Sequence, residues 1–183
     1  MEETPVATDE LDRSLVRRFL GGEREAAAAL VDLYQQRLFN LALRMLGNMQ
    51  DAEDVTQTVF GKVFRKLGTY DPKYRFFSWI YRMTVNESMN ALKRRKRTVT
   101  LEDQLAIPAP GATADGAAEA EDQVGRALMS LKPDDRAVLV LRHFVSFSYQ
   151  EIADVLEIPV RTVKSRLFEA RERLRHTLRA QGS

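Results

Sequence analysis

Apolar residues recur at spacings of three and four along almost the whole chain of 183 residues. Such spacing places them on one side of an α-helix, whereas a half-buried strand needs strict alternation. The clearest stripes occupy residues 30–45, 52–67 and 77–92. We find no alternating pattern that would predict a strand, and no internal repeat. The sequence therefore predicts an all-α fold.

The ends of the first helices are marked by glycine. Gly47 and Gly68 follow the first two stripes, where glycine readily takes the left-handed conformation that ends a helix. A third long helix is expected at residues 76–96, and a weaker helical pattern occupies residues 9–20. Residues 1–97 are therefore expected to form one bundle of about four helices.

Residues 98–118 interrupt the helical pattern. Prolines and glycines lie there among acids and alanines, and large apolar side chains are scarce. This composition is typical of a flexible linker. A surface loop within one domain is the alternative, which the length of the segment disfavours. Helical patterns resume afterwards, so residues 119–183 are expected to form a second domain of about four helices.

Charge is sorted along the chain, although the formal net charge is only +2. Residues 93–97 are five consecutive bases, and residues 101–122 hold six acids and no base. Residues 161–175 hold six bases against two acids. This separation predicts different tasks for different parts of the chain.

The composition argues against several classes of function. Cysteine is absent, so the sequence offers neither a disulfide nor a thiolate metal site. His143 and His176 lie far apart, and no phosphate-binding glycine pattern is present, so we predict no catalytic site, no metal and no cofactor. No apolar run approaches the roughly 20 residues that span a bilayer. The acidic N-terminus does not resemble a signal peptide, and we expect a cytoplasmic protein without membrane insertion.

The C-terminal residues predict a helix-turn-helix. Ser148 and Glu151 have the spacing of a capping box that opens a short helix ending near Leu156. The last helix, residues 159–178, has one apolar side and one basic side. Arg and Lys suit phosphates and guanine edges, and an outward Phe suits a thymine methyl group. A solvated basic face, with Phe168 packed on a neighbouring helix, is the alternative. The basic side consists of Arg161, Lys164, Ser165, Phe168, Arg171 and Arg175.

Residues 69–82 interleave six aromatic side chains with basic ones. Rings stack on unpaired bases while basic side chains neutralise phosphate, so this combination predicts binding of single-stranded DNA. The alternative is that several rings belong to the core, and we expect Phe77, Tyr81 and in part Trp79 to be structural. The run at residues 93–97 exceeds what a helix end needs and predicts a further phosphate contact. The basic members of the segment are Lys73, Arg75 and Arg82.

Five stretches resemble a known family, the extracytoplasmic-function (ECF, group 4) sigma factors of the sigma-70 family. Two of the stretches resemble region two of this family: residues 51–60 (DAEDVTQTVF) and 77–86 (FSWIYRMTVN). The other three resemble region four: residues 131–139 (LKPDDRAVL), 148–153 (SYQEIA) and 159–167 (PVRTVKSRL). The resemblance implies a sigma factor that binds bacterial core RNA polymerase, recognises promoter DNA and assists strand opening. It also implies that residues 1–97 are the region-two domain and residues 119–183 the region-four domain.

Three sets of site residues follow from the resemblance. The set implied to dock on the beta-prime subunit of the polymerase is Asp54, Val55, Gln57 and Phe60. The set implied at the minus-ten element, joined by part of the basic run, is Tyr70, Trp79, Asn86, Lys93, Arg94 and Arg95. The set implied in the major groove of the minus-thirty-five element is Arg161, Thr162, Lys164, Ser165, Phe168 and Arg171. Thr58 and Glu169 depart from the family pattern, which usually has an acid and a base at these positions.

The resemblance also implies the partners. They are the beta-prime and beta subunits of core RNA polymerase, promoter DNA in duplex and single-stranded form, and an anti-sigma factor as a candidate regulator. The acidic linker is implied to lie in a basic polymerase channel as a nucleic-acid mimic, with a solubilising tether as the alternative. The alternative function is a stand-alone helix-turn-helix regulator, which would bind duplex DNA as a dimer without polymerase.

Overall fold

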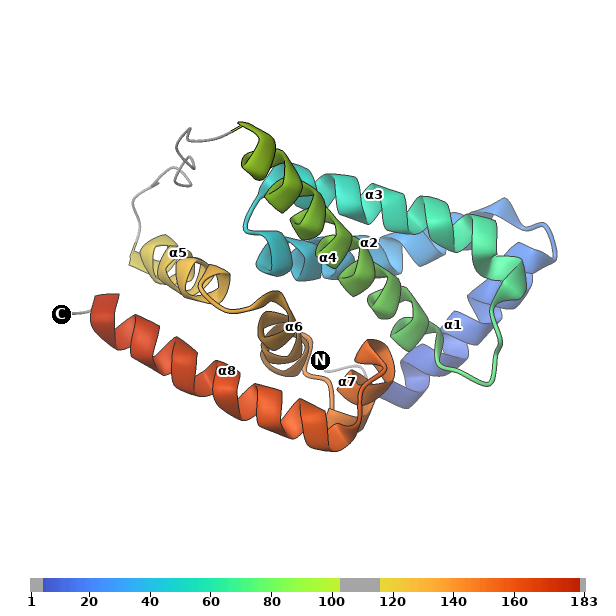
Figure 1. Ribbon diagram of the computed structural model, residues 1–183. Helices are drawn as coiled ribbons and strands as arrows, with labels where there is room; N and C mark the ends of the chain where they lie inside the picture. The colour runs from blue at the N-terminus through green and yellow to red at the C-terminus, as the bar shows by residue number, and fades with distance from the viewer. Residues whose placement is uncertain (1–4, 103–115, 182–183) are drawn as a thin grey trace.

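The computed structural model describes residues 5–102 and 116–181, and Figure 1 shows that helices dominate this part of the chain. The N-terminal elements are α1 (Pro5–Leu20), α2 (Arg24–Leu46), α3 (Met49–Lys66), the 3-10 turn η1 (Leu67–Thr69) and α4 (Phe76–Glu102). Helices α2, α3 and α4 pack on one another, and α1 packs on α2 and α4. No strand occurs in the described residues, and the all-α prediction is confirmed.

The C-terminal elements form a second group of helices. They are α5 (Gly116–Met129), α6 (Pro133–His143), α7 (Tyr149–Leu156) and α8 (Val160–Gln181). The long helix α8 packs on the other three. Helices α7 and α8 form the predicted helix-turn-helix, and the turn between them begins at Glu157, whose φ of 54° is left-handed. This turn aims α8 along the outer side of the molecule (Figure 1).

Gly47 and the capping box fix helix ends as the sequence predicted, but the prediction for Gly68 is wrong, because α3 ends at Lys66 and Gly68 lies inside the 3-10 turn η1 without a left-handed φ. Gly47 ends α2 with a φ of 68°, and the Asn48 side chain accepts a hydrogen bond from the Asp51 backbone amide at 2.9 Å. Ser148 and Glu151 form the predicted capping box of α7. The Ser148 hydroxyl accepts from the Glu151 amide at 3.2 Å, and the Glu151 carboxylate accepts from the Ser148 amide at 2.8 Å.

The predicted apolar stripes form the core. Leu30, Tyr34, Leu38, Leu41 and Met45 of the first stripe are all buried, as are the members of the second. The apolar spacing after Pro133 in the sequence predicts that Phe144 lies on the buried side of a helix. This prediction is wrong, because α6 ends at His143 and Phe144 is 40% exposed. Its ring instead carries the Arg44 guanidinium at 3.8 Å.

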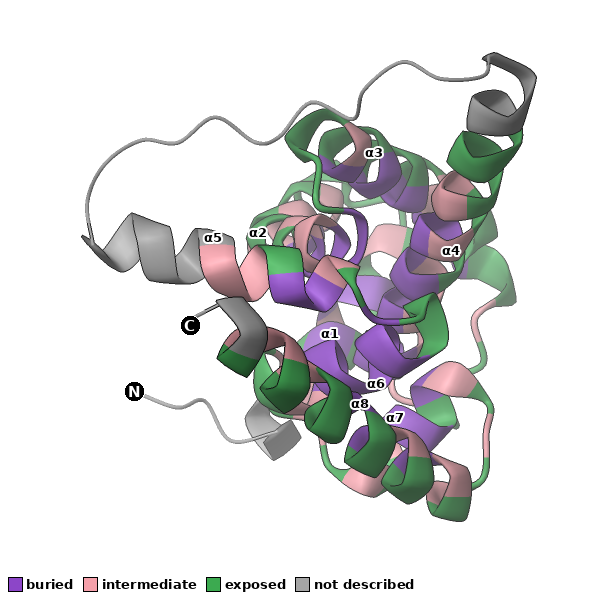
Figure 2. Ribbon diagram, turned by 60° about the vertical axis from the view of Figure 1, so that its left-hand side comes forward, coloured by how far each residue is buried: buried purple, intermediate pink, exposed green. Residues whose placement is uncertain are grey.

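The two helical groups share one continuous buried core, in which α4 contacts α7 and α2 contacts α5 and α6. Figure 2 shows buried residues between these helices and exposed residues along the outer side of α8. Helix α4 continues to Glu102 and α5 begins at Gly116, so helical residues enter both ends of the predicted linker. Residues 103–115 lie outside the described part of the chain.

Candidate nucleic-acid interface

Helix α8 presents an exposed polar side along its length. Arg161, Lys164, Ser165 and Phe168 are exposed there, and Thr162 beside them is half-buried. The spacing of these exposed residues repeats that of a helix face, which is why one side of α8 gathers them. The opposite side packs on α5, α6 and α7 and holds Val163, Leu167, Ala170 and Leu174. The structure therefore brings most of the predicted duplex-reading residues together.

The exposure of Phe168 distinguishes between a DNA-contacting face and a face on which Phe168 packs against a neighbouring helix. Packing on a neighbouring helix would bury the ring, but Phe168 is 67% exposed. An exposed aromatic ring among basic side chains is suited to apolar contact with a base or sugar. Ser165 donates its hydroxyl to the Thr162 carbonyl at 3.1 Å and keeps lone pairs that can accept. Arg171, the last predicted contact, donates to His143 Nε2 at 3.3 Å and so lies beside the end of α6.

The aromatic-basic segment begins with a cluster of rings at the start of α4. Tyr70 lies 5.6 Å from the Phe76 ring and 5.4 Å from the Trp79 ring, and its hydroxyl donates to the Tyr74 carbonyl. Burial, with a contribution from Asp9, raises the pKa of Tyr70 to about 12, so its hydroxyl keeps its proton at neutral pH. Tyr70 and Trp79 are half-buried, which leaves part of each ring open.

The predicted structural role of Phe77, Tyr81 and in part Trp79 is confirmed, but the prediction did not single out Phe76, which is fully buried. Phe77 and Tyr81 are buried, Trp79 is half-buried and Tyr74 is 68% exposed. Asn86 is exposed two helical turns beyond Trp79, and Lys93 is exposed two turns beyond Asn86. Residues seven apart share a helix face, so these three side chains follow one side of α4. Arg94 and Arg95 are also exposed, next to Lys93.

The residues implied to dock on polymerase lie on α3. Asp54 and Gln57 are exposed, whereas Val55 is 3% and Phe60 is 9% exposed. Phe60 stacks on Phe64 with ring centroids 6.2 Å apart. The set therefore divides into two side chains that a partner can touch and two that hold α3 against the bundle.

Comparison with known proteins decides the family. Residues 30–98 match the family model for Sigma-70 region 2, and residues 121–174 match the model for Sigma-70, region 4, together more than half of the chain. The chain is 36% identical over 178 residues to the RNA polymerase sigma-H factor of Pseudomonas aeruginosa, covering 90% of this chain and 92% of that protein. The chain belongs to the sigma-70 family.

Further relatives place it in the ECF group of that family. It is 30% identical over 177 residues to the ECF RNA polymerase sigma factor SigW of Bacillus subtilis, covering 90% of this chain and 95% of the relative. It is similar in structure to CnrH in a complex with the cytosolic domain of CnrY, with a TM-score of 0.71 and 27% identity over 93% of this chain and 98% of that one. The protein is thus an RNA polymerase sigma factor, a class of non-catalytic transcription initiation factors.

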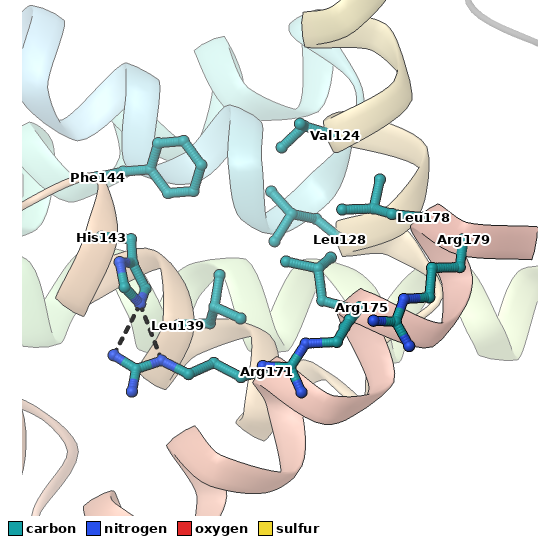
Figure 3. Close-up of a pocket in the computed structure, with 10 residues that line it drawn as sticks. Val124, Leu128, Leu139, His143, Phe144, Arg171, Arg175, Leu178 and Arg179 are labelled. Atoms are coloured by element: carbon teal, nitrogen blue, oxygen red, sulfur yellow. Dashed lines mark hydrogen bonds between the residues drawn. The ribbon is translucent and has the colours of Figure 1, made fainter. Parts of the chain in front are cut away.

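This sigma factor also carries an apolar pocket that the sequence did not reveal. The pocket has a volume of about 570 Å³ and lies between α5, α6 and α8 (Figure 3). Val124, Leu128 and Leu178 form part of its apolar wall, and His143 and Arg171 meet at its edge. Desolvation, with the nearby Arg171 and Arg142, lowers the pKa of His143, so its ring stays neutral near pH 7. The basic edge further includes Arg175 and Arg179.

Contacts between the two domains of the sigma factor were also missed. Arg75 and Arg82, for which the sequence predicts phosphate contacts, pair in this structure with Glu151 of α7 and with Glu157, which follows α7. Arg136 is buried at 4% exposure and donates to backbone carbonyls of both domains. Sequence spacing gives no signal for such pairs, because the partners lie more than 70 residues apart. Phe144, Val145 and Phe147, three apolar residues in a segment outside the expected helices, were an available hint.

Within residues 5–102 and 116–181, no helix has the length and apolar content that crossing a bilayer requires. No group of three His, Asp or Glu side chains in the same part of the chain has a metal-binding arrangement.

Proposed function

We propose that this sigma factor reads duplex promoter DNA with α8 and an unpaired strand with α4. The proposal rests on one observation, namely that a single chain presents two different surfaces suited to nucleic acid. The exposed side of α8 combines Arg161, Lys164 and Phe168, which suits the major groove. One side of α4 combines Trp79 with Asn86, which suits stacking and edge recognition of an unstacked base.

Residue roles within these surfaces follow from exposure. Tyr70 and Trp79 offer ring faces at the start of α4, and Asn86 offers an amide that both donates and accepts. Lys93, Arg94 and Arg95 neutralise phosphates further along α4. On α8, Thr162 and Ser165 supply hydroxyl groups and Arg171 contacts the backbone at the edge of the groove.

Docking on core polymerase is proposed on α3. Asp54 and Gln57 make direct polar contacts with the beta-prime subunit because they are exposed, and Val55 and Phe60 keep α3 in place. A second contact is proposed at the pocket between α5, α6 and α8. Its apolar wall and basic edge fit an apolar segment of the beta subunit that carries acidic flanks, through hydrophobic burial and charge complementarity.

The domain limits and cellular role are proposals of the same kind. Residues 1–97 act as the region-two domain, residues 98–118 as a linker and residues 119–183 as the region-four domain. The sigma factor has no catalytic activity of its own and acts in the cytoplasm, where polymerase and DNA are. An anti-sigma factor is proposed as a regulator, and a similar fold has been solved as the sigma factor RpoE in a complex with the anti-sigma factor NepR from Bartonella quintana (TM-score 0.72, 24% identity).

The test is transcription with purified components. The full chain is mixed with bacterial core polymerase and a pool of genomic fragments, and run-off transcripts are sequenced. Selective initiation that depends on the chain supports the proposal, and the start sites give the promoter sequence. Absence of core binding, together with tight duplex binding as a dimer, would show that the chain is a stand-alone regulator.

Matched variants separate the two DNA surfaces. Lys164→Ala removes a base from the exposed side of α8, and Asn86→Ala removes the amide from α4. The first should weaken duplex binding and the second should slow strand opening without changing duplex affinity. Arg24→Ala, which removes an exposed base at the start of α2, is the control and should change neither.

A further inference from the structure

Helix α8 holds only two acidic residues, Glu169 and Glu172, and both are exposed. Phe168, which directly precedes Glu169, is 67% exposed. Ser165 lies about one helical turn before Glu169 and Thr162 about two turns before it, so these three polar side chains share one side of the helix. An acid is thus part of the face that is proposed to enter the major groove.

The bases that could neutralise Glu169 within its own helix are paired elsewhere. Side chains three or four residues apart on a helix are neighbours, so Arg166 and Arg173 are the bases within reach. Arg166 forms an ion pair with Asp134 of α6 at 3.8 Å. Arg173 forms one with Asp135 of α6 at 3.9 Å. In the described part of the chain, the Glu169 carboxylate takes part in no ion pair and no hydrogen bond.

Glu172 is the contrasting case on the same helix. It is exposed like Glu169, but its Oε1 accepts a hydrogen bond from Arg175 at 2.5 Å. Arg175 lies three residues further along α8, which is the spacing that brings two side chains together. The helix therefore has one acid whose charge is paired within the chain and one whose carboxylate is available to a ligand.

A carboxylate on a DNA-binding face is unfavourable unless it meets a hydrogen-bond donor. Duplex DNA carries one negative charge for about every 1.7 Å of its axis, and like charges that face each other across an interface reduce affinity. A carboxylate accepts hydrogen bonds and donates none. The donors in the major groove are the N4 amino group of cytosine and the N6 amino group of adenine. Glu169 therefore either lowers affinity for every sequence or recognises one of these two bases.

Cytosine suits a carboxylate better than adenine does. The edge of cytosine in the major groove offers the N4 donor and no acceptor. Adenine places its N7 acceptor beside the N6 donor, so a carboxylate that reaches N6 also faces N7 without a proton to share. An amide side chain, which both donates and accepts, is the group that matches adenine. The chemistry of Glu169 thus selects cytosine, and a glutamine at the same position would select adenine.

We propose that Glu169 is a specificity-determining residue, which accepts a hydrogen bond from the amino group of a cytosine in the minus-thirty-five element. The inference rests on the proposed function of α8 and adds one base to the sequence that this helix reads. Glu169 follows Arg161 by about 12 Å along the helix, which is the length of about three or four base-pair steps of about 3.4 Å. The cytosine should lie that far from the base pair that Arg161 contacts.

The first experiment identifies the bases that the holoenzyme selects. The full chain is combined with bacterial core polymerase and with a promoter from the transcription assay whose minus-thirty-five element is randomised, and the retained DNA fragments are sequenced. At one position, the wild-type chain should favour cytosine by about five- to tenfold over the other bases. Glu169→Gln should favour adenine at that position, and Glu169→Ala should show no preference there. Glutamine has the length and nearly the helix propensity of glutamate, so α8 should stay folded.

The second experiment compares two promoters that differ only by cytosine or adenine at that position. In run-off transcription, the wild-type holoenzyme should prefer the cytosine promoter by about five- to tenfold, and Glu169→Gln should reverse the preference. A reversal cannot arise from partial unfolding or from a uniform change of charge. The matched control is Glu172→Gln, which removes the same charge from the paired acid of α8 and should leave the base preference unchanged.

The outcomes separate this inference from the proposed function of α8. If Glu169→Gln selects the same bases as the wild-type chain, or binds every sequence more tightly by one factor, the carboxylate only repels phosphate and the inference is overturned. If the wild-type holoenzyme selects no base in the randomised element and Lys164→Ala binds as tightly as wild type, α8 does not read the duplex. The proposed function then fails together with the inference, whereas the first result leaves that function intact.

Discussion

Replacing Arg136 should destabilise the protein more than most single substitutions in the chain. Its guanidinium is 4% exposed and donates only to groups inside the protein. Burial lowers its pKa to about 10, which still leaves it charged at neutral pH. A charged donor that satisfies several carbonyls at once ties together helix ends that otherwise have unpaired acceptors. Its backbone acceptors are the carbonyls of Leu128 at 2.9 Å, Met129 at 2.9 Å, Leu131 at 3.0 Å and Met45 at 2.5 Å.

The magnitude follows from what a substitution leaves behind. Arg136→Met keeps the length and apolar stem of the side chain but removes every donor. Each carbonyl left buried and unpaired costs about 1–3 kcal/mol, and water entering the site recovers part of that. With four such carbonyls and partial hydration of the site, we expect a loss of about 3–5 kcal/mol. This is a large share of the roughly 5–15 kcal/mol that holds a domain folded.

Urea denaturation followed by circular dichroism at 222 nm measures this loss. The comparison variant is Arg24→Met, which removes an exposed arginine from the start of α2 and should change the free energy of unfolding by less than about 0.5 kcal/mol. Arg136→Lys should fall between the two, because an ammonium cannot span the same carbonyls. A loss below about 1 kcal/mol for Arg136→Met would refute the reasoning, since it would mean that the carbonyls are readily hydrated.

Three further predictions concern single side chains. Burial raises the pKa of Asp12 from an ordinary value of 3.8 to about 6, although the hydrogen bond from Tyr34 acts in the opposite direction. The carboxyl group of Asp12 therefore holds its proton more tightly in the native state than in the unfolded state. The free energy of unfolding should therefore fall as pH rises from about 4 through 6, by at most about 3 kcal/mol, and Asp12→Asn should flatten this fall in urea titrations. Phe168→Ala should change stability by less than about 0.5 kcal/mol but weaken duplex promoter binding about tenfold in anisotropy titrations. Leu178→Glu should weaken binding to core polymerase measured by surface plasmon resonance, while free-chain affinity for duplex DNA stays unchanged.

The fold was predictable because burial follows helical spacing in this chain. Residues such as Leu38 and Val59 lie at the positions that a 3.6-residue period turns inward, and both are fully buried. The capping box at Ser148 was equally readable, because both partners lie within four residues. Local patterns of this kind depend only on neighbours in the sequence, so they can be predicted without knowledge of the tertiary structure.

The candidate site was predictable in part, for the same reason. The outward position of Phe168 follows from its place on a helix whose opposite side is apolar, and the structure confirms it. The burial of Val55 and Phe60 was not separated from the exposure of Asp54 and Gln57, because a resemblance names positions without their orientation. The pairing of Arg82 with Glu157 depends on how two domains meet, and no local pattern encodes that.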